Sequence, residues 1–485
     1  MLFNSIDFCL FLPIIFSLYW FFFQKNLKAQ NLLILAASYF FYSCWDWRFL
    51  FLLIFSTSLD YYTAIRVESA NSKAQQKFWF WLSIIVNLGF LGVFKYYDFF
   101  ASSFAEALSL LGFSVSPWLL NIVLPVGISF YTFHGLSYLI DVYYRRIKAE
   151  RNFVDYAVFV SFFPLLVAGP IERATHLLPQ IKVARTFAYH RAVDGMRQIL
   201  WGLFKKVVIA DNCAEYANIV FNGADSFSGS TLLLGAIFFS FQIYGDFSGY
   251  SDIALGTARL FGIELLKNFS FPYFSRDIAE FWRRWHISLS GWFRDYLYIP
   301  LGGNKGSIGV RVRNTFIIFI VSGFWHGANW TFIFWGALNA LYFLPLLLMK
   351  SNRTHLETVA SGRILPSPSE FFKMSLTFLM VTFGWIFFRA ADLHHAFAFI
   401  DNMFTIDFFV SKAGDFARAK VHPAILLIFL IIFFVTEWIG RESHFALEKW
   451  RVGKSPFLRL LFYFFLLASV LIYSGKQEQF IYFQF

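Results

Sequence analysis

Two histidines in the second half of the chain are the first candidates for chemistry. His286 closes the run Trp282-Arg-Arg-Trp-His286, and His326 lies within Phe324-Trp-His326-Gly-Ala-Asn-Trp330 in an otherwise apolar stretch. A strongly polar side chain at membrane depth costs about 2 to 4 kcal/mol, so such residues usually line a cavity or take part in chemistry. Because an imidazole can take and return a proton near neutral pH, His326 is a candidate general base. The alternative is a satisfied hydrogen bond between helices.

The two histidines are expected at different depths. A helix that begins at Arg313 and rises about 1.5 Å per residue places His326 about 20 Å into the hydrocarbon layer, past its midplane. Residues 281–293 instead combine an apolar stripe with a basic face, which predicts one helix lying in the headgroup region. His286 would then lie near the cytoplasmic mouth, either as a functional residue or as an interfacial residue bonded to lipid or backbone.

A third polar cluster lies inside the apolar block 230–258. It includes two carboxylates and two glycines, and its candidate substrate-binding residues are Gln242, Asp246, Ser248 and Asp252. Carboxylates at membrane depth favour a broken helix that lines a wet cavity. Close helix packing explains the glycines equally well, but it does not explain Asp246. His134 and Asp141 form a weaker signal of the same kind in block 119–144.

The composition is that of a polytopic all-α membrane protein. Hydrophobic residues make up 58% of the chain and charged residues 15%, and the mean hydropathy is +0.57. About twelve blocks could cross, or nearly cross, a layer of about 30 Å. They are 6–23, 31–45, 48–64, 78–95, 119–144, 195–211, 230–258, 313–325, 330–349, 371–389, 423–440 and 455–474. Block 153–171 ends in Gly-Pro and is expected to be re-entrant.

The charges and the cysteines exclude several classes. The net charge of +11 fits cytoplasmic loops and anionic lipid headgroups better than nucleic acid. Alternation of twelve spans places most basic loops in the cytoplasm and both termini outside. Three separated cysteines give neither a metal site nor a disulfide framework. One membrane domain is expected over 1–485, with a catalytic core at about 119–349 and a C-terminal tail at 475–485.

Four segments together resemble the membrane-bound O-acyltransferase family. They resemble its bacterial branch, which includes the alginate O-acetylation membrane subunit and the teichoic-acid D-alanyl transferase subunit. The segments are 246–251, 281–290, 294–303 and 324–330, and the resemblance extends over nearly the whole sequence. It implies that His326 is the essential histidine of the family and that His286 is its upstream partner position. It also implies a narrow channel that links a cytoplasmic donor site to an outward-facing funnel.

The resemblance further implies the setting and the partners of the reaction. The chain is expected in the bacterial inner membrane, where it would pass an acyl group, most simply acetyl, to a separate extracytoplasmic acetyltransferase. That partner would complete the reaction on a polysaccharide. The donor would be acetyl-coenzyme A or an acyl-carrier-protein thioester, and no bound cofactor is expected.

Basic and polar residues near the histidines complete the predicted substrate site. Arg283, Arg284 and Arg294 suit the phosphates of a cytoplasmic donor. Trp325 adjoins His326, and Asn329 would lie one helical turn away, at i+3, where its amide could orient the imidazole or the thioester carbonyl.

The last six residues, 480–485, are unusually aromatic for a polar tail. Aromatic anchoring at the membrane interface is the favoured explanation. The functional alternative is that the tail folds into the outer funnel and that Tyr482 carries the acyl group as a tyrosyl ester. A phenol with a pKa of about 10 needs a base beside it for that step, and His326 would supply one.

Two other functions stay open. Intramembrane Asp246, Asp252, His134 and His326 could line the path of a transporter, although two related halves are not visible in the sequence. Within the enzyme class, the acceptor could be the hydroxyl of a lipid or a protein.

Overall fold

The computed structural model describes residues 1–167, 169–405, 419–449, 455–474 and 480–481. Helices are the regular structure throughout these ranges, which confirms the all-α prediction for them. The chain divides into two compact units. Unit 1 comprises residues 1–189 with 258–266, and unit 2 comprises residues 190–257 with 267–485.

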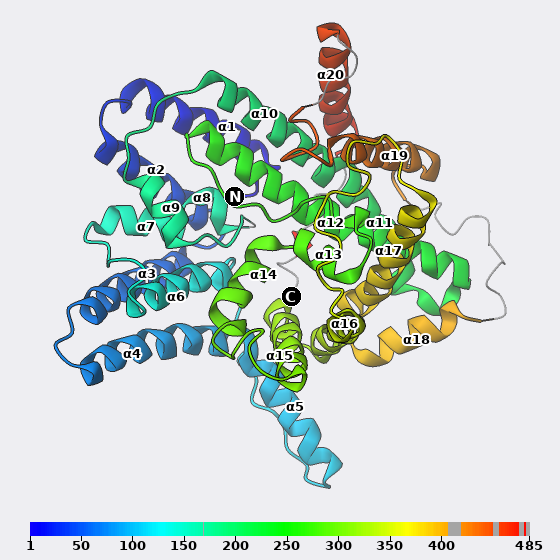
Figure 1. The fold of residues 1–485 in the computed structure, drawn as a ribbon, viewed down its shortest axis with the longest axis horizontal. Helices are drawn as coiled ribbons and strands as arrows, with labels where there is room; N and C mark the ends of the chain where they lie inside the picture. The colour runs from blue at the N-terminus through cyan, green and yellow to red at the C-terminus, as the bar shows by residue number, and fades with distance from the viewer. Residues whose placement is uncertain (168, 406–418, 450–454, 475–479, 482–485) are drawn as a thin grey trace. The chain divides into compact units, whose positions relative to one another are not determined.

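Unit 1 is a bundle of helices (Figure 1). Its helices are α1 (Ile6–Ser17), α2 (Leu27–Ser43), α3 (Trp47–Glu68), α4 (Lys73–Leu91), α5 (Tyr97–Leu110), α6 (Ile128–Tyr143), α7 (Phe153–Ser161), α8 (Phe163–Leu166) and α9 (Ala174–Ile181). Helices α3, α4 and α6 pack together. Between them the buried Asp60 of α3 accepts hydrogen bonds from Ser83 (2.6 Å) and Asn87 (2.7 Å) of α4.

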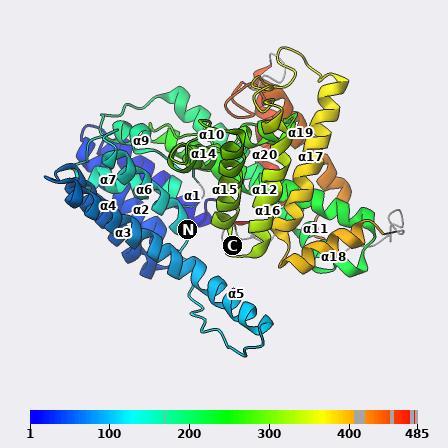
Figure 2. The same ribbon diagram turned by 60° about the horizontal axis from the view of Figure 1, so that its bottom comes forward.

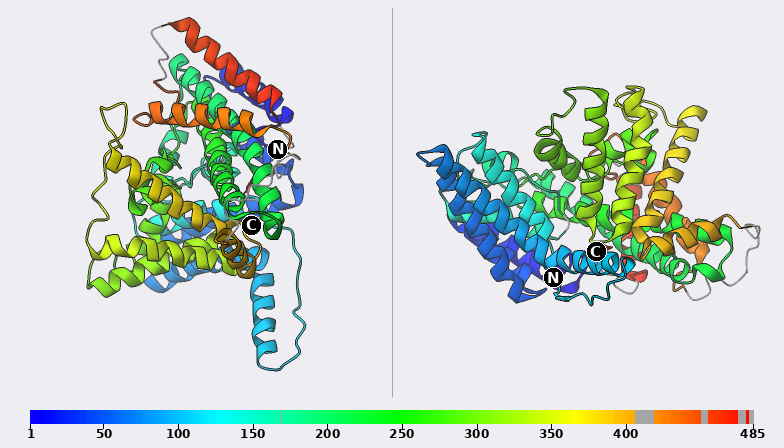
Figure 3. Two further views of the ribbon diagram at one scale, coloured as in Figure 1. Left: turned by 90° about the vertical axis from the view of Figure 1, so that its right-hand side faces the viewer. Right: turned by 90° about the horizontal axis from the view of Figure 1, so that it is seen from below.

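The structure corrects the predicted span 119–144. Residues 111–127 are not helical, and α6 begins only at Ile128. Pro125 lacks a backbone N–H, and Gly127 has a positive φ of 74°, so a helix cannot run through this stretch. The preceding α5 continues from α4 through the π-helical turn η2 (Gly92–Tyr96) and projects away from α3 and α4 (Figures 2 and 3).

Unit 2 holds the remaining helices and, apart from the weaker candidates His134 and Asp141, every predicted site residue that the structure describes. They are α10 (Tyr189–Leu203), α11 (Asp211–Asn222), α12 (Gly229–Leu260, which extends into unit 1), α13 (Ile278–Arg284), α14 (Ile287–Phe293), α15 (Ile308–His326), α16 (Trp330–Leu348), α17 (Pro368–Arg389), α18 (Leu393–Met403), α19 (Pro423–Gly440) and α20 (Pro456–Ile472). The π-helical turn η3 (Phe204–Ala210) joins α10 to α11. Helices α15, α16 and α17 lie side by side in the right-hand view of Figure 3.

The predicted break inside 230–258 is wrong, because α12 is one continuous helix. Its glycines serve close packing instead. A Cβ on Gly249 would lie 2.8 Å from the carbonyl oxygen of Gly202, and one on Gly256 would lie 2.5 Å from that of Gly195. Small residues at these contacts let α10, η3 and α12 approach closely.

Among the residues that the structure describes, seven helical segments are long and apolar enough to cross a membrane. They are Trp47–Glu68, Lys73–Leu110, Gly229–Leu260, Ile308–His326, Trp330–Leu348, Pro368–Arg389 and Pro423–Gly440, and Ile6–Phe22 and Pro456–Ile472 are shorter apolar helices. Helix α7 has nine residues and spans only about 13 Å, too little to cross. The total of twelve spans and the re-entrant path of 153–171 stay predictions.

Candidate active site

The structure replaces the single helix expected over 281–293 with two short helices. Asp277 caps α13 by accepting a hydrogen bond from the Glu280 N–H. The chain then leaves the helical conformation at Trp285, and His286 has a φ of +43°, in the left-handed region. The N–H of Ile287 donates to the carbonyl oxygen of Asn268 at 2.9 Å and holds the break in place.

This break buries His286 instead of leaving it on a surface helix. The side chain is only 1% exposed, and the ring of Phe247 from α12 meets it edge-on at 4.7 Å between centroids. Because burial disfavours the charged imidazolium, the pKa of His286 falls to about 3. His286 is therefore neutral at physiological pH.

The same break brings His286 close to His326. The centroids of the two imidazole rings lie 6.2 Å apart, at an interplanar angle of 49°. His326 is the last residue of α15 and is 3% exposed. The prediction that the two residues lie at well separated depths does not hold in this geometry, because the segment carrying His286 folds inward.

Aromatic rings enclose the histidine pair. The ring of Trp325 lies 5.8 Å from that of His286. Around His326, Trp335 of α16 and Phe388 of α17 each lie 5.3 Å away and meet the imidazole at steep angles. Such an apolar wall excludes water and strengthens electrostatic interactions with any polar group that enters.

Asn329 does not lie one helical turn from His326, because α15 ends at His326 and the chain is extended at Gly327. Asn329 instead caps α16. Its side-chain oxygen accepts from the Thr331 N–H at 3.0 Å, and its amide donates to the carbonyl oxygen of Ala391 at 2.8 Å. In this position the side chain holds the turn between α15 and α16, and a role in substrate binding stays a prediction.

The predicted basic mouth contains arginines in different settings. Arg283 donates to the carbonyl oxygens of Asn352 and His355, each at 2.7 Å. Arg284 forms an ion pair with Glu280 at 2.9 Å. Arg294 is the most exposed of the three, at 66% of its side chain, and pairs with Asp295. Arg283 and Arg284 thus stabilise the loop around α13, and donor binding by the three residues stays a prediction.

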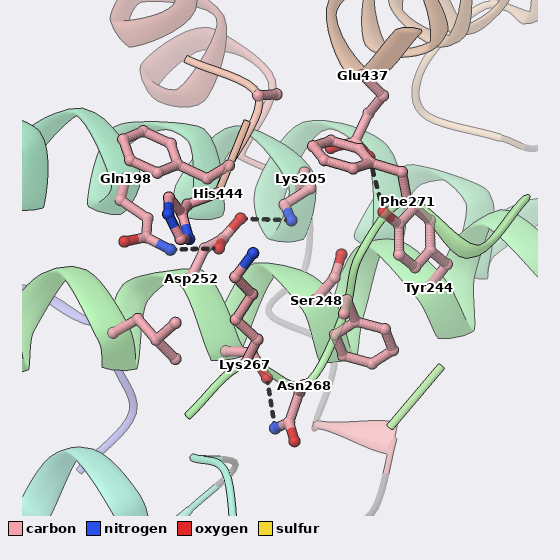
Figure 4. A pocket seen from close by; sticks show the side chains of 15 residues that line it. Gln198, Lys205, Tyr244, Ser248, Asp252, Lys267, Asn268, Phe271, Glu437 and His444 are labelled. Carbon is pink, nitrogen blue, oxygen red and sulfur yellow. Dashed lines mark hydrogen bonds and ion pairs between the residues drawn. The ribbon is translucent and has the colours of Figure 1, made fainter. Parts of the chain in front are cut away.

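Asp252 and Ser248 line a polar pocket of about 390 Å³ that includes its open mouth (Figure 4). Asp252 pairs with Lys205 at 2.6 Å and accepts a hydrogen bond from Gln198 at 2.8 Å. His444 and Lys267 also line this pocket. Neither histidine of the pair is among its lining residues.

Asp246 lies at the centre of a buried ion-pair network. Lys206 contacts Asp246 and Asp211, each at 2.7 Å. The second oxygen of Asp246 accepts a hydrogen bond from the backbone N–H of Ile481 at 2.7 Å. The carboxylate of Asp246 is therefore bonded both to Lys206 and to the C-terminal segment, residues 480–481. Gln242, one turn earlier on α12, is also buried.

Sequence reasoning missed Lys205 and Lys206, although the signal was present. Both lie in block 195–211, which was expected to cross the membrane, and two adjacent cations at that depth require partners. The structure provides those partners as Asp252 for Lys205 and as Asp246 and Asp211 for Lys206.

The C-terminal segment is not anchored at an interface where the structure describes it. Phe480 is 0% exposed and Ile481 is 1% exposed. Phe480 contacts Phe247 at 5.9 Å and Tyr250 at 4.7 Å, ring centroid to ring centroid. These contacts contradict interfacial anchoring for Phe480. Tyr482 lies outside the described residues.

His134 and Asp141, the weaker candidates, have structural partners within unit 1. The Nε2 atom of His134 accepts a hydrogen bond from the Glu172 N–H at 3.0 Å, and Asp141 pairs with Arg146 at 2.9 Å. These contacts favour a role in helix packing.

Comparison with known proteins gives a consistent result. A sequence profile of the membrane-bound O-acyltransferase family matches residues 144–387. The chain is 41% identical to the probable alginate O-acetylase AlgI of Pseudomonas aeruginosa, over 82% of this chain and 73% of the relative. It is 37% identical to the peptidoglycan O-acetyltransferase of Helicobacter pylori, over 79% of this chain and 75% of the relative.

A more distant relative is the teichoic acid D-alanyltransferase of Bacillus subtilis, which is 27% identical over 57% of this chain and 71% of its own length. The matched profile covers the buried histidine pair and the helices that surround it. The chain is therefore an integral membrane protein that belongs to the membrane-bound O-acyltransferase family, and it is an O-acyltransferase.

Proposed function

We propose that the chain takes an acetyl group from a cytoplasmic thioester and transfers it across the membrane toward hydroxyls of an extracytoplasmic polysaccharide. The donor is acetyl-coenzyme A or an acetylated carrier protein. The observation that supports this proposal most is the buried pair of His286 and His326, with ring centroids 6.2 Å apart. The relatives named for O-acetylation of alginate and of peptidoglycan favour acetyl as the group and a polysaccharide as the acceptor.

In this proposal His326 is the general base. Its neutral imidazole takes the proton of the attacking hydroxyl as the hydroxyl oxygen bonds to the thioester carbonyl carbon. The carbon–sulfur bond then breaks, and the imidazolium returns the proton to the leaving thiolate. The products are an ester and a free thiol, and the histidine regains its neutral form. General base catalysis of this kind contributes typically about 10²- to 10⁴-fold.

His286 has a different role in the proposal. Because burial keeps it neutral, it can offer one hydrogen-bond donor and one acceptor without adding charge to the site. A neutral donor can polarise the thioester carbonyl and stabilise the oxyanion as it forms. His286 is thus proposed as the group that orients and polarises the donor, while His326 moves the proton.

The route to the site is a narrow channel from each face of the membrane. The proposal requires it because the ring of His326 is 3% exposed and lies among aromatic side chains. A narrow apolar route admits the slender thioester arm and keeps water from hydrolysing it. The proposal places both termini outside the cytoplasm and the chain in the bacterial inner membrane.

Thioester consumption in proteoliposomes tests the reaction class. With acetyl-coenzyme A or acetylated carrier protein supplied on the donor side, acetyl should leave the thioester and free thiol should accumulate, with no net flux of solute. Comparison of the two donors identifies the carrier. Solute flux without thiol release would instead support a transporter. Full transfer of acetyl to a lipid without any partner protein would show that the acceptor is a lipid and not a polysaccharide.

Tyr482 is proposed as an intermediate acyl carrier between this chain and a separate extracytoplasmic transferase. The support is that the neighbouring Ile481 is held by Asp246 on α12, one residue before Phe247, which contacts His286. The phenol oxygen would attack the thioester carbonyl carbon and lose its proton to His326. The carbon–sulfur bond then breaks, the leaving thiolate takes the proton from His326, and the products are a tyrosyl ester and a free thiol.

Mass spectrometry of the C-terminal peptide should detect that ester after incubation with donor. Tyr482→Phe should eliminate both the ester and the final product, because it lacks the nucleophilic oxygen. Tyr473→Phe, at the C-cap of α20, is the matched control and should retain both. Normal polysaccharide acetylation by Tyr482→Phe would exclude the carrier role.

A further inference from the structure

A buried ionic site on unit 2 receives the C-terminal segment. Lys206 of η3 lies between the carboxylates of Asp211 and Asp246 at 2.7 Å from each. All three residues are less than one tenth exposed. The remaining oxygen of Asp246 accepts the backbone N–H of Ile481 at 2.7 Å. This bond joins positions far apart in the sequence, α12 and the end of the chain.

The hydrogen bond from the Ile481 N–H to the Asp246 carboxylate is a charge-assisted hydrogen bond. A backbone N–H that donates to an ionised carboxylate is roughly twice as strong as a bond between neutral groups, and burial removes competition from water. A buried carboxylate is stable only if it is paired and hydrogen-bonded, which Lys206 and Ile481 achieve together for Asp246. The contact is made by the backbone, so it fixes the path of the chain and not the identity of one side chain.

Apolar contacts complete the seat for this segment. The Phe480 ring packs against Phe247 and Tyr250 of α12. Tyr250 follows Asp246 at i+4 and so lies on the same face of the helix. Phe247 in turn meets the His286 ring at 4.7 Å. The seat therefore adjoins the histidine pair through a single aromatic side chain.

We infer that Asp246, with Lys206 and Asp211, forms an anchor that positions Phe480 and Ile481 beside the histidine pair. Asp246 is thus a positioning residue and not a substrate-binding residue. The inference deepens the proposed function, since it rests on the acyl-carrier role of the tail for its purpose. The anchoring itself requires no chemistry and can be measured without it.

Thiol labelling of a buried position in the segment tests the anchor. Cys9, Cys44 and Cys213 are first replaced with alanine, and Ile481→Cys is introduced as the reporter, which keeps the backbone N–H. This chain, with the three alanine replacements and the reporter, is the parent. In detergent solution a maleimide should label the reporter thiol of the parent slowly. Asp246→Asn and Lys206→Met should each accelerate labelling at least tenfold, because the segment leaves its seat.

Lys205→Met is the matched control. Lys205 precedes Lys206 on the same turn, is similarly buried and forms its own ion pair with Asp252, but no ion pair joins it to the anchor residue Asp246. Its loss should leave the labelling rate within twofold of the parent. Equal acceleration in Lys205→Met and Lys206→Met would show general loosening of unit 2 and overturn the inference.

A second variant acts from the tail, in case loss of a buried charge unfolds the unit. Ile481→Pro removes the donated N–H and leaves the ionic site intact, and Phe480→Cys is then the reporter. The Phe480→Cys thiol should be labelled at least tenfold faster with Ile481→Pro than without it. Unchanged labelling in this variant and in Asp246→Asn would overturn the anchor. It would also be overturned if the reporter thiol at position 481 reacted as fast as the exposed Cys9 does in a second chain that keeps Cys9 as its one cysteine.

The same reporter separates the anchor from the chemistry. His326→Ala should abolish acyl transfer but leave the reporter thiol at position 481 protected, because His326 is not part of the seat. Accelerated labelling in Asp246→Asn together with undiminished polysaccharide acetylation would retain the anchor and reject the tail as a carrier. Failure of the anchor and failure of the proposed function therefore give different results.

Discussion

The neutral state of His286 is set by burial at one residue, in a left-handed turn between two short helices. Its pKa of about 3 lies well below the value near 6.5 of an exposed histidine, because the ring loses its hydration and lies against Phe247. Protonation is therefore easier in the unfolded chain than in the folded one. The contribution of the neutral His286 ring to the free energy of unfolding is therefore fully present above pH 6.5, and it is lost as the pH falls from 6.5 toward 3.

A pH series of thermal unfolding in detergent tests this consequence. The wild-type melting temperature should fall as the pH is lowered from 6.5 to 4, and His286→Asn should lose less stability over the same range, because asparagine does not titrate. His394→Ala, at an exposed residue of α18, is the control and should follow the wild type. Identical pH profiles for wild type and His286→Asn would contradict the burial of a neutral ring.

Both histidines could be identified from the sequence, because aromatic, basic or apolar surroundings make a polar ring conspicuous. Their pairing could not, since it depends on a chain break at Trp285 that the apolar stripe of 281–293 did not indicate. The predicted position of Asn329 was wrong for a similar reason. The i+3 spacing assumed that the helix continues past His326, whereas α15 ends there and the chain is extended at Gly327. The partners of Arg283 are backbone carbonyls of a distant loop, which no side-chain pattern reveals.

At the scale of elements, the α15–α16 hairpin sets the position of His326. The two helices touch at glycines. A Cβ on Gly323 would lie 2.1 Å from the carbonyl oxygen of Phe332, and one on Gly336 would lie 2.3 Å from that of Phe319. Backbone atoms cannot move aside as a flexible side chain would, so an added methyl group must separate the helices.

Gly336→Ala should therefore displace His326 from its partners. Overpacking of this kind costs about 1 to 3 kcal/mol, and acyl transfer should fall at least tenfold while some folded protein remains. Gly384→Ala on α17 is the matched control, because a Cβ there would lie 3.7 Å from the Trp335 ring, an ordinary contact. Full activity and an unchanged melting temperature in Gly336→Ala would show that the hairpin does not depend on this contact.

Apolar length predicted some elements well and others poorly. Block 330–349 corresponds closely to α16, which begins after its polar cap Asn329. Block 313–325 lies within α15 and matches its end, but the helix begins earlier, at Ile308, after the cap Ser307. Block 119–144 failed at its start, where Pro125 and Gly127 interrupt a run that is apolar but not helical. In α12 the carboxylates suggested a break, whereas lysines of η3 neutralise them within a continuous helix.

At the scale of the whole molecule, hydropathy identified the membrane class and composition excluded soluble enzymes. Family membership follows from motifs spread over much of the chain and from the matched profile. The acceptor, the donor and the partner cannot be read from helix packing, because one fold can serve different substrates. For this reason the tail, which the sequence marked only by its aromatic residues, became informative only once Ile481 was placed against Asp246.

The central claim is that the buried pair of His286 and His326 performs acyl transfer. The direct measurement is the rate of acetyl transfer from a labelled thioester by purified wild type, His326→Ala and the control His394→Ala in the same proteoliposomes. The claim predicts a loss of at least about 100-fold in His326→Ala alone, with expression and melting temperature near those of wild type. Transfer at the wild-type rate by folded His326→Ala would contradict it.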